Sequence, residues 1–248
     1  MNAKKWIAHF EINRHAWAEP DWAADSPILS EKRTRLLVDS LATFQLGESG
    51  GGTRLKSFVA QSWEGSPDYK EAVDLFVAEE QYHAEILAKA VIYLNGELKS
   101  KHWMNSIFRK FRTLIGLEFN LQILLTAELI AEAYYGILAK HVPDPVIKSM
   151  CQKVLRDEVK HIAFHEEFFR LNQRRWLPIS STIWSLQFQA VFMCVERAVW
   201  LDHGKCLMGF GISKHDFRAK AQGVCRRFLN RVIMLPSLST SAQAHAKM

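Results

Sequence analysis

The stretch LFVAEEQYHAEIL, from Leu75 to Leu87, places an acid and an imidazole on the apolar side of a predicted helix. At helical spacing, Glu80 and His83 fall within the apolar stripe that contains Phe76. Burying an isolated carboxylate is costly, so these side chains need compensating partners inside the core.

A second stretch repeats this pattern. EEQYH ends at His83, and DEVKH ends at His161. In both, an acid precedes a Glu-x-x-His motif, whose Glu and His share one face of a helix. Chance alone gives about one Glu-x-x-His pair in such a chain. Two copies that also share the preceding acid therefore indicate a functional site.

Two further glutamates, Glu48 and Glu128, lie on apolar stripes about 30 residues before Glu80 and Glu158. Turn signals lie midway between the members of each pair, EGSPD in the first and HVPDP in the second. Residues equidistant from the turn of an antiparallel hairpin lie level with each other. The two hairpins are thus predicted to bring four carboxylates and two imidazoles into one layer of a bundle core.

The patterning is helical nearly throughout and shows no strand signal. The predicted helices cover about residues 29–63, 68–95, 105–141, 144–173, 178–208 and 214–233. We therefore expect an all-α fold with one domain over residues 1–235 and a flexible tail at 236–248. The candidate metal-binding core covers about residues 30–172, with additional N- and C-terminal helices around it.

The composition fits a folded chain, because its 248 residues include 8 Trp and 15 Phe. A net charge of +6 permits an acidic partner without requiring one, and the basic C-terminal region is interpreted as a solvated face, a docking face or an RNA-binding face. The four cysteines form no C-x-x-C pair, and the N-terminus has no apolar signal core, so a cytoplasmic location is expected. No uninterrupted apolar run predicts a membrane span.

Four buried carboxylates would repel one another strongly without cations. Oxygen-rich sites with some imidazole suit iron or manganese, whereas structural zinc sites use more Cys and His. Six side chains from four helices can hold two metal ions, as in ferritin-like di-metal carboxylate proteins.

In these motifs the chain resembles the ferritin-like di-iron oxygenase superfamily, which includes soluble methane monooxygenase, the acyl-carrier-protein desaturases and the aromatic amine N-oxygenases. The resemblance implies a ferritin-like four-helix bundle with two bridging glutamates, two terminal glutamates and one His for each iron. The corresponding residues are, in that order, Glu80 and Glu158, Glu48 and Glu128, and His83 and His161.

The resemblance also gives the acids before the motifs a role. Glu79 and Asp157 are expected to orient the metal-bound histidines, often across to the facing helix. The N-oxygenases carry one more His, at the position of Val154 here, so the resemblance to that group is incomplete. Glu132 is an alternative ligand to Glu128, and His165 is either an extra ligand or a hydrogen-bonded core histidine.

The glycines after Glu48, Gly50, Gly51 and Gly52, are costly in a helix interior. They indicate either a helix break with close packing or space beside the metals. Glu196 is expected to pair with a neighbour rather than with a metal.

The predicted function is a di-iron mono-oxygenase or oxidase that uses O2 as co-substrate. Its substrate is hydrophobic or tethered to a carrier protein, and hydroxylation, desaturation and N-oxygenation share this type of site. Electrons would come from an external ferredoxin or reductase. The alternatives are a ferroxidase or iron-handling protein, a di-metal tRNA hydroxylase and a plain bundle with structural acids. A mixed Mn/Fe pair and a homodimer through the C-terminal helices remain open.

Overall fold

The computed structural model describes residues 2–23, 27–49, 52, 55–56, 67–102, 117–173 and 178–233. Over these residues the chain is helical and contains no strand, which confirms the all-α prediction. The elements are α1 (Ala3–Asn13), α2 (Glu31–Glu48), α4 (Pro67–Tyr93), α6 (Leu117–His141), α7 (Pro145–Gln173), α8 (Pro178–Gly209) and α9 (Lys214–Ile233).

The observed helix ends agree closely with the predicted ones for α4, α7, α8 and α9. Helix α2 ends at Glu48, well before the predicted end near residue 63. The predicted start of the third helix at residues 105–116 and the tail at 236–248 lie outside the described residues.

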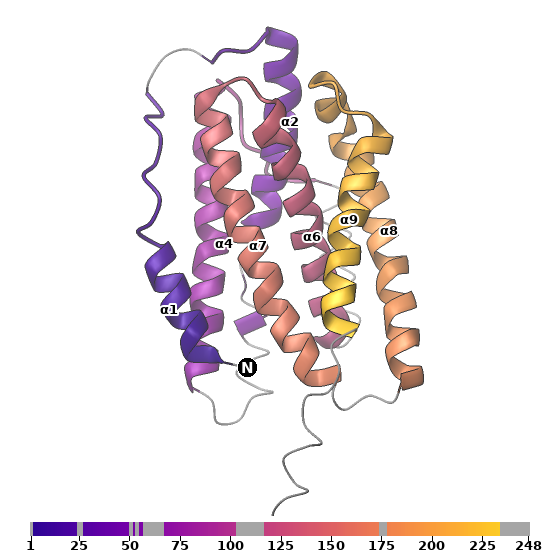
Figure 1. The fold of residues 1–248 in the computed structure, drawn as a ribbon. Coiled ribbons are helices and arrows are strands. Elements are labelled where there is room, and N and C mark those ends of the chain that lie inside the picture. The colour runs from indigo at the N-terminus through magenta and orange to yellow at the C-terminus, as the bar shows by residue number, and fades with distance from the viewer. Residues whose placement is uncertain are drawn as a thin grey trace, which may run out of the picture.

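Helices α2, α4, α6 and α7 lie side by side, while α1 covers the outside of α4 and α8 and α9 flank α6 (Figure 1). The closest packing is between α6 and α7 and between α2 and α4. These are the two hairpins expected from the sequence. Their pairing places the C-terminal end of α2 beside the middle of α4.

The turn between α6 and α7 is fixed by a buried acid. Asp144 precedes Pro145 at the start of α7, and its Oδ1 accepts a hydrogen bond from the backbone N–H of Ile147 at 3.0 Å. Its Oδ2 accepts from the backbone N–H of Ile28 and from the hydroxyl of Tyr93. One side chain thus caps α7 and ties its start to the chain before α2 and to the end of α4.

Helix α6 forms the centre of the core. Its segment Leu121–His141 is long and apolar enough to cross a membrane by length and composition, but 83% of its apolar 18-residue window is buried inside the structure. This is the pattern of a core helix. Helix α8 is different, because it buries one side while Ile183, Leu186 and Leu201 remain exposed on its outer side.

Gly52 is required where it stands. Its φ is +44°, and a Cβ added there would lie 2.2 Å from Cγ1 of Val77 on α4. At this position the structure supports the interpretation of a helix break with close packing. Gly50 and Gly51 lie outside the described residues.

Candidate metal centre

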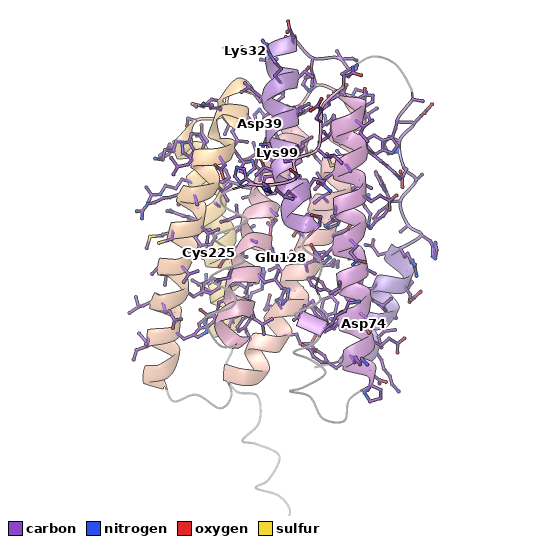
Figure 2. The ribbon with its side chains drawn as sticks, turned by 180° about the vertical axis from the view of Figure 1, so that it is seen from behind. Lys32, Asp39, Asp74, Lys99, Glu128 and Cys225 are labelled. Atoms are coloured by element: carbon purple, nitrogen blue, oxygen red, sulfur yellow. The ribbon has the colours of Figure 1, made fainter. Side chains whose placement is uncertain are left out.

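The six predicted ligands come from the four helices of the two hairpins, and their side chains meet in the interior. Glu48 is the last residue of α2, α4 carries Glu80 and His83, α6 carries Glu128, and α7 carries Glu158 and His161. Figure 2 shows Glu128 on α6, in the middle of the bundle. Both histidines are fully buried, and Glu128 and Glu158 are almost so.

His161 lies at the centre of the group. Its Nδ1 is 2.6 Å from Oε1 of Glu80, 3.3 Å from Oε2 of Glu128 and 3.9 Å from Oε2 of Glu158. Two sets of donor atoms lie within 4.8 Å of one another, Glu80 with His83 and His161, and Glu128 with Glu158 and His161. Each set could hold a metal ion.

The four glutamates form two pairs of carboxyl groups. Glu48 is hydrogen-bonded to Glu80, and Glu128 to Glu158. Burial, together with the charge and hydrogen bond of the neighbouring carboxyl, raises the pKa of Glu48 and of Glu158 well above the usual range. Although burial acts to raise it, hydrogen bonds from Glu158 and His161 lower the pKa of Glu128 to about 2.

These shifts indicate what compensates the acids when no metal is bound. Glu48 and Glu158 each retain a proton. The pKa of His161 is also raised, against the effect of burial, by the charge of Glu80 and by hydrogen bonds to Glu128, Glu79 and Glu80. These protons thus balance the negative charge of the carboxylates, which bound cations would otherwise balance. This donor set fits two divalent metals, because loading would replace those protons.

Each histidine is held across the bundle by the acid of the facing helix. Nε2 of His83 lies 2.9 Å from Oδ2 of Asp157 on α7, and Nε2 of His161 lies 2.8 Å from Oε2 of Glu79 on α4. With Nε2 donating to the acid, Nδ1 of each ring faces the glutamates. Among the described residues, Nδ1 of His83 has no hydrogen-bond partner, which is the state of an available ligand atom.

Asn13, at the end of α1, joins the two acids. Its Nδ2 donates to Oε1 of Glu79 and, at 2.9 Å, to Oδ1 of Asp157. Lys153 donates to Oδ2 of Asp157 at 2.7 Å. Although burial acts against it, the hydrogen bond from His83 and the charge of Lys153 hold the pKa of Asp157 well below its usual range.

Sequence reasoning missed both Asn13 and Lys153. Asn13 lies 66 residues before Glu79, in a separate amphipathic helix, and no spacing rule connects the two. Lys153 lies one turn before Asp157 on the same face of α7, and its burial at that spacing was the available signal.

The two alternative ligands are not among the converging donor atoms. Oε1 of Glu132 accepts from Arg227 of α9 at 2.7 Å, so Glu132 faces α9 and does not replace Glu128 in the group. His165 is buried edge-on against Phe76, with ring centroids 5.2 Å apart. Its Nε2 has no hydrogen-bond partner among the described residues, and burial lowers its pKa to about 4. His165 belongs to neither set of converging donor atoms, and it lacks the hydrogen bond expected of a core histidine at that nitrogen.

Glu196 pairs with a charged neighbour, as predicted. Its Oε2 lies 3.6 Å from Nε of Arg218 on α9, which gives this buried acid a charged neighbour away from the metal centre.

A cavity of about 160 Å³ adjoins the glutamates on the side formed by α2, α6 and α8. Glu48, Glu128 and Glu158 line it, whereas His83 and His161 do not. Its other lining residues are mainly apolar, among them Phe44, Leu124, Ile130, Val195 and Val199, with His102 and His203 as further polar groups.

Comparisons with protein-family models, with curated proteins and with solved structures find no match to the chain. The functional assignment therefore rests on the geometry of the four helices and their side chains. That geometry consists of five donor side chains in two overlapping sets, with Glu48 hydrogen-bonded to Glu80, two cross-helix acid–histidine pairs and one adjoining cavity.

Proposed function

We propose that the chain is a ferritin-like di-iron oxidoreductase that uses O2 to oxidise a small organic substrate. The observation that carries this proposal is a layer of four carboxylates and two imidazoles, all buried except the half-buried Glu48, in which each imidazole is oriented by an acid of the facing helix. A purely structural bundle gains little from such a layer, because buried carboxylates are costly when they are not paired.

The residues assigned to the metals follow the two hairpins. Glu80 and Glu158 would be shared between the ions, Glu48 and Glu128 would bind at the ends, and His83 and His161 would bind one ion each. Two iron ions, or a mixed Mn/Fe pair, would supply the redox chemistry toward O2. The protein supplies ligand positions, charge balance and exclusion of water.

The chain's own groups also control protons at this site. Metal loading would displace the protons of Glu48, Glu158 and Nδ1 of His161, whereas Glu79 and Asp157 would keep the protons on Nε2 of the two histidines. The network on the α1 side can therefore hold the rings in place while the charge of the glutamates changes.

The cavity favours an organic substrate over iron handling. Its walls are mainly apolar, and three of the four glutamates open onto it. A ferroxidase needs a polar route for iron ions, whereas an oxidase of organic compounds needs an apolar space beside its metals. Electrons would come from an external ferredoxin or reductase.

The test is anaerobic titration with Fe(II), followed by stopped-flow absorbance on mixing with O2. The expected result is saturation at about two irons per chain and a transient absorbance band in the visible region. Uptake that continues well past this stoichiometry without a transient band would replace the proposal with iron handling. No iron uptake would return the acids to a structural role.

Helix α6 offers a matched pair of variants for this titration. Glu128→Ala removes a proposed ligand, and Glu132→Ala removes the same side chain one turn later, where it pairs with Arg227. We expect Glu128→Ala to lose stoichiometric iron binding and Glu132→Ala to retain it. Equal behaviour of the two variants would contradict the ligand assignment.

A further inference from the structure

The cavity beside the glutamates has a second polar end on α8. Val195, Val199 and His203 recur at every turn of α8 along the cavity wall, so the wall extends about 12 Å along the helix. Glu48, Glu128 and Glu158 are the acidic groups of the cavity, and a substrate beside them can also reach the imidazole of His203.

The volume of the cavity restricts the size of its ligand. A cavity of about 150 Å³ in an engineered protein interior holds benzene, and this one measures about 160 Å³. It therefore fits a single ring or a compact aliphatic group. A long acyl chain on a carrier protein does not fit this space.

His203 is oriented by a buried hydrogen-bonded chain. Its Nδ1 lies 2.7 Å from Oγ of Ser40 on α2, and Ser40 in turn contacts the hydroxyl of Tyr134 on α6. The hydroxyl of Tyr134 donates to Sγ of Cys206 at 3.8 Å. The imidazole also packs on Phe44, with ring centroids 4.3 Å apart.

One arrangement of protons along these hydrogen bonds leaves Nε2 of His203 as an acceptor. The Tyr134 hydroxyl donates to sulfur, and either hydroxyl can donate in the Ser40–Tyr134 contact; we assign the Ser40 proton to the Tyr134 oxygen. The Ser40 oxygen then accepts the proton on Nδ1 of His203. Burial, aided by the charges of His102 and Lys99, lowers the pKa of His203 to about 3, so the ring is neutral. Its Nε2 carries no proton and is a hydrogen-bond acceptor.

The charged groups near this end are already paired. Nζ of Lys99 lies 2.6 Å from Oδ1 of Asp39, two residues that Figure 2 shows next to each other, and Nε2 of His102 lies 3.7 Å from Oδ2 of Asp202. Lys99 and Asp39 thus neutralise each other, and Asp202 lies beside the imidazole of His102. At this end the cavity therefore offers the neutral imidazole of His203 beside a mainly apolar wall.

We propose that Nε2 of His203 binds an uncharged hydroxyl or amine N–H of the substrate, and that the substrate is a single-ring or similarly compact molecule. This inference rests on the proposed function in one respect. It takes the ligand of the cavity to be the substrate, because the cavity adjoins the proposed metal ligands. Its carbon skeleton would extend from His203 toward Glu48, Glu128 and Glu158. The polar group is thus held at the end away from the metal centre.

The test compares phenol, toluene and benzoate as probes. Phenol and toluene have similar size and shape, so their difference isolates the hydroxyl, and benzoate adds a charge. Dissociation constants come from NMR titration of the full chain, both metal-free and after anaerobic loading with Fe(II). One hydrogen bond predicts phenol binding roughly five- to tenfold tighter than toluene, with benzoate weakest.

The variant His203→Phe keeps the ring and removes the acceptor. We expect it to bind phenol and toluene equally, with toluene unchanged within about twofold. His141→Phe, at an exposed site on α6, is the control and should keep the preference for phenol. Equal binding of phenol and toluene by the unaltered chain, or a preference that survives His203→Phe, would overturn the proposal, as would no binding of either probe.

A second readout uses the unaltered chain and therefore does not depend on whether a variant folds. Long-range ¹⁵N NMR of the unaltered chain should show His203 as neutral, with the proton on Nδ1 and the lone pair on Nε2. A proton on Nε2 would overturn the proposal. Because the probe titration also uses the metal-free chain, a phenol preference without iron uptake would reject the di-iron function and leave the binding site intact.

Discussion

The two sides of the candidate metal centre differ in what surrounds the proposed ligands, a hydrogen-bonded network on one side and a cavity on the other. On the side of α1, α4 and α7, Asn13, Glu79, Asp157 and Lys153 form a continuous network that holds both histidines. On the side of α2, α6 and α8, the glutamates face a mainly apolar cavity. The first side fixes ligand atoms in place, and the second leaves space beside them.

The energetics of the two sides differ accordingly. A buried polar network strengthens a fold only when its members are satisfied, and the network around the histidines largely meets that condition. A cavity lowers stability, because the side chains that line it lose packing contacts on that side. A chain that keeps such a space beside buried acids gives up stability for the ability to bind a ligand.

The largest expected effect comes from removing a shared glutamate. Glu158→Ala, or Glu80→Ala, should abolish binding of both metals rather than one, because each of these carboxylates is assigned to both ions. Iron per chain after anaerobic loading and desalting measures the effect. Retention of two irons by either variant would contradict the assignment.

A smaller effect is expected from the network that supports the histidines. Asn13→Ala removes the amide that joins Glu79 to Asp157. Loss of such an outer contact typically weakens metal affinity 10- to 100-fold, so Fe(II) should bind more weakly by about that factor while the stoichiometry stays at two. Competition with a chromophoric chelator measures the affinity.

The matched control for that variant lies on the same helix. Asn2→Ala removes an Asn whose side chain caps α1 by accepting from the backbone N–H of Lys5. It should leave the Fe(II) affinity unchanged. If both variants lower the affinity equally, α1 acts through its general packing and Asn13 has no specific positioning role.

The cavity side should respond in the opposite way. Val199→Phe places a larger side chain into the space that adjoins the glutamates. We expect phenol affinity to fall at least tenfold and Fe(II) affinity to change by less than twofold, because Val199 contributes to the wall and not to the metal ligands. Phenol binding that is unchanged in this variant would place the probe outside the cavity.

The difference between the two sides also explains what the sequence could predict. The sequence could predict a single layer for Glu48, Glu80, Glu128 and Glu158. Residues equidistant from the turn of an antiparallel hairpin lie level with each other, and the members of each pair are only about one hairpin apart in sequence. The buried positions of His83 and His161 followed from helical periodicity. Both signals are local, and each covers about one hairpin.

The contacts that complete each side are long-range and have no such signal. Asn13 meets Asp157 across 144 residues, and Ser40 meets His203 across 163. Their partners are set by how α1 and α8 dock on the bundle, which depends on the shapes of packed side chains. The apolar pattern of α8 does not predict which side of this helix docks on the bundle, because its apolar residues lie on its exposed side as well as its buried side.

The smallest expected effect concerns the pH dependence of stability on the cavity side. His203 has its pKa lowered to about 3 by burial, from an ordinary value of 6.5. Below pH 6.5 the unfolded chain binds a proton that the folded chain does not, so this residue makes folding less favourable as the pH falls. Between pH 7 and pH 5.5 the loss attributable to His203 is about 1 kcal/mol. Urea unfolding of the metal-free chain at both pH values measures it.

His203→Phe should lose about that much less stability than the unaltered chain, whereas the exposed His141→Phe should show the full loss. An equal loss in the unaltered chain and in His203→Phe would mean that His203 is protonated in the folded chain. That result would remove the neutral acceptor from the cavity and leave the network around His83 and His161 as the oriented part of the site.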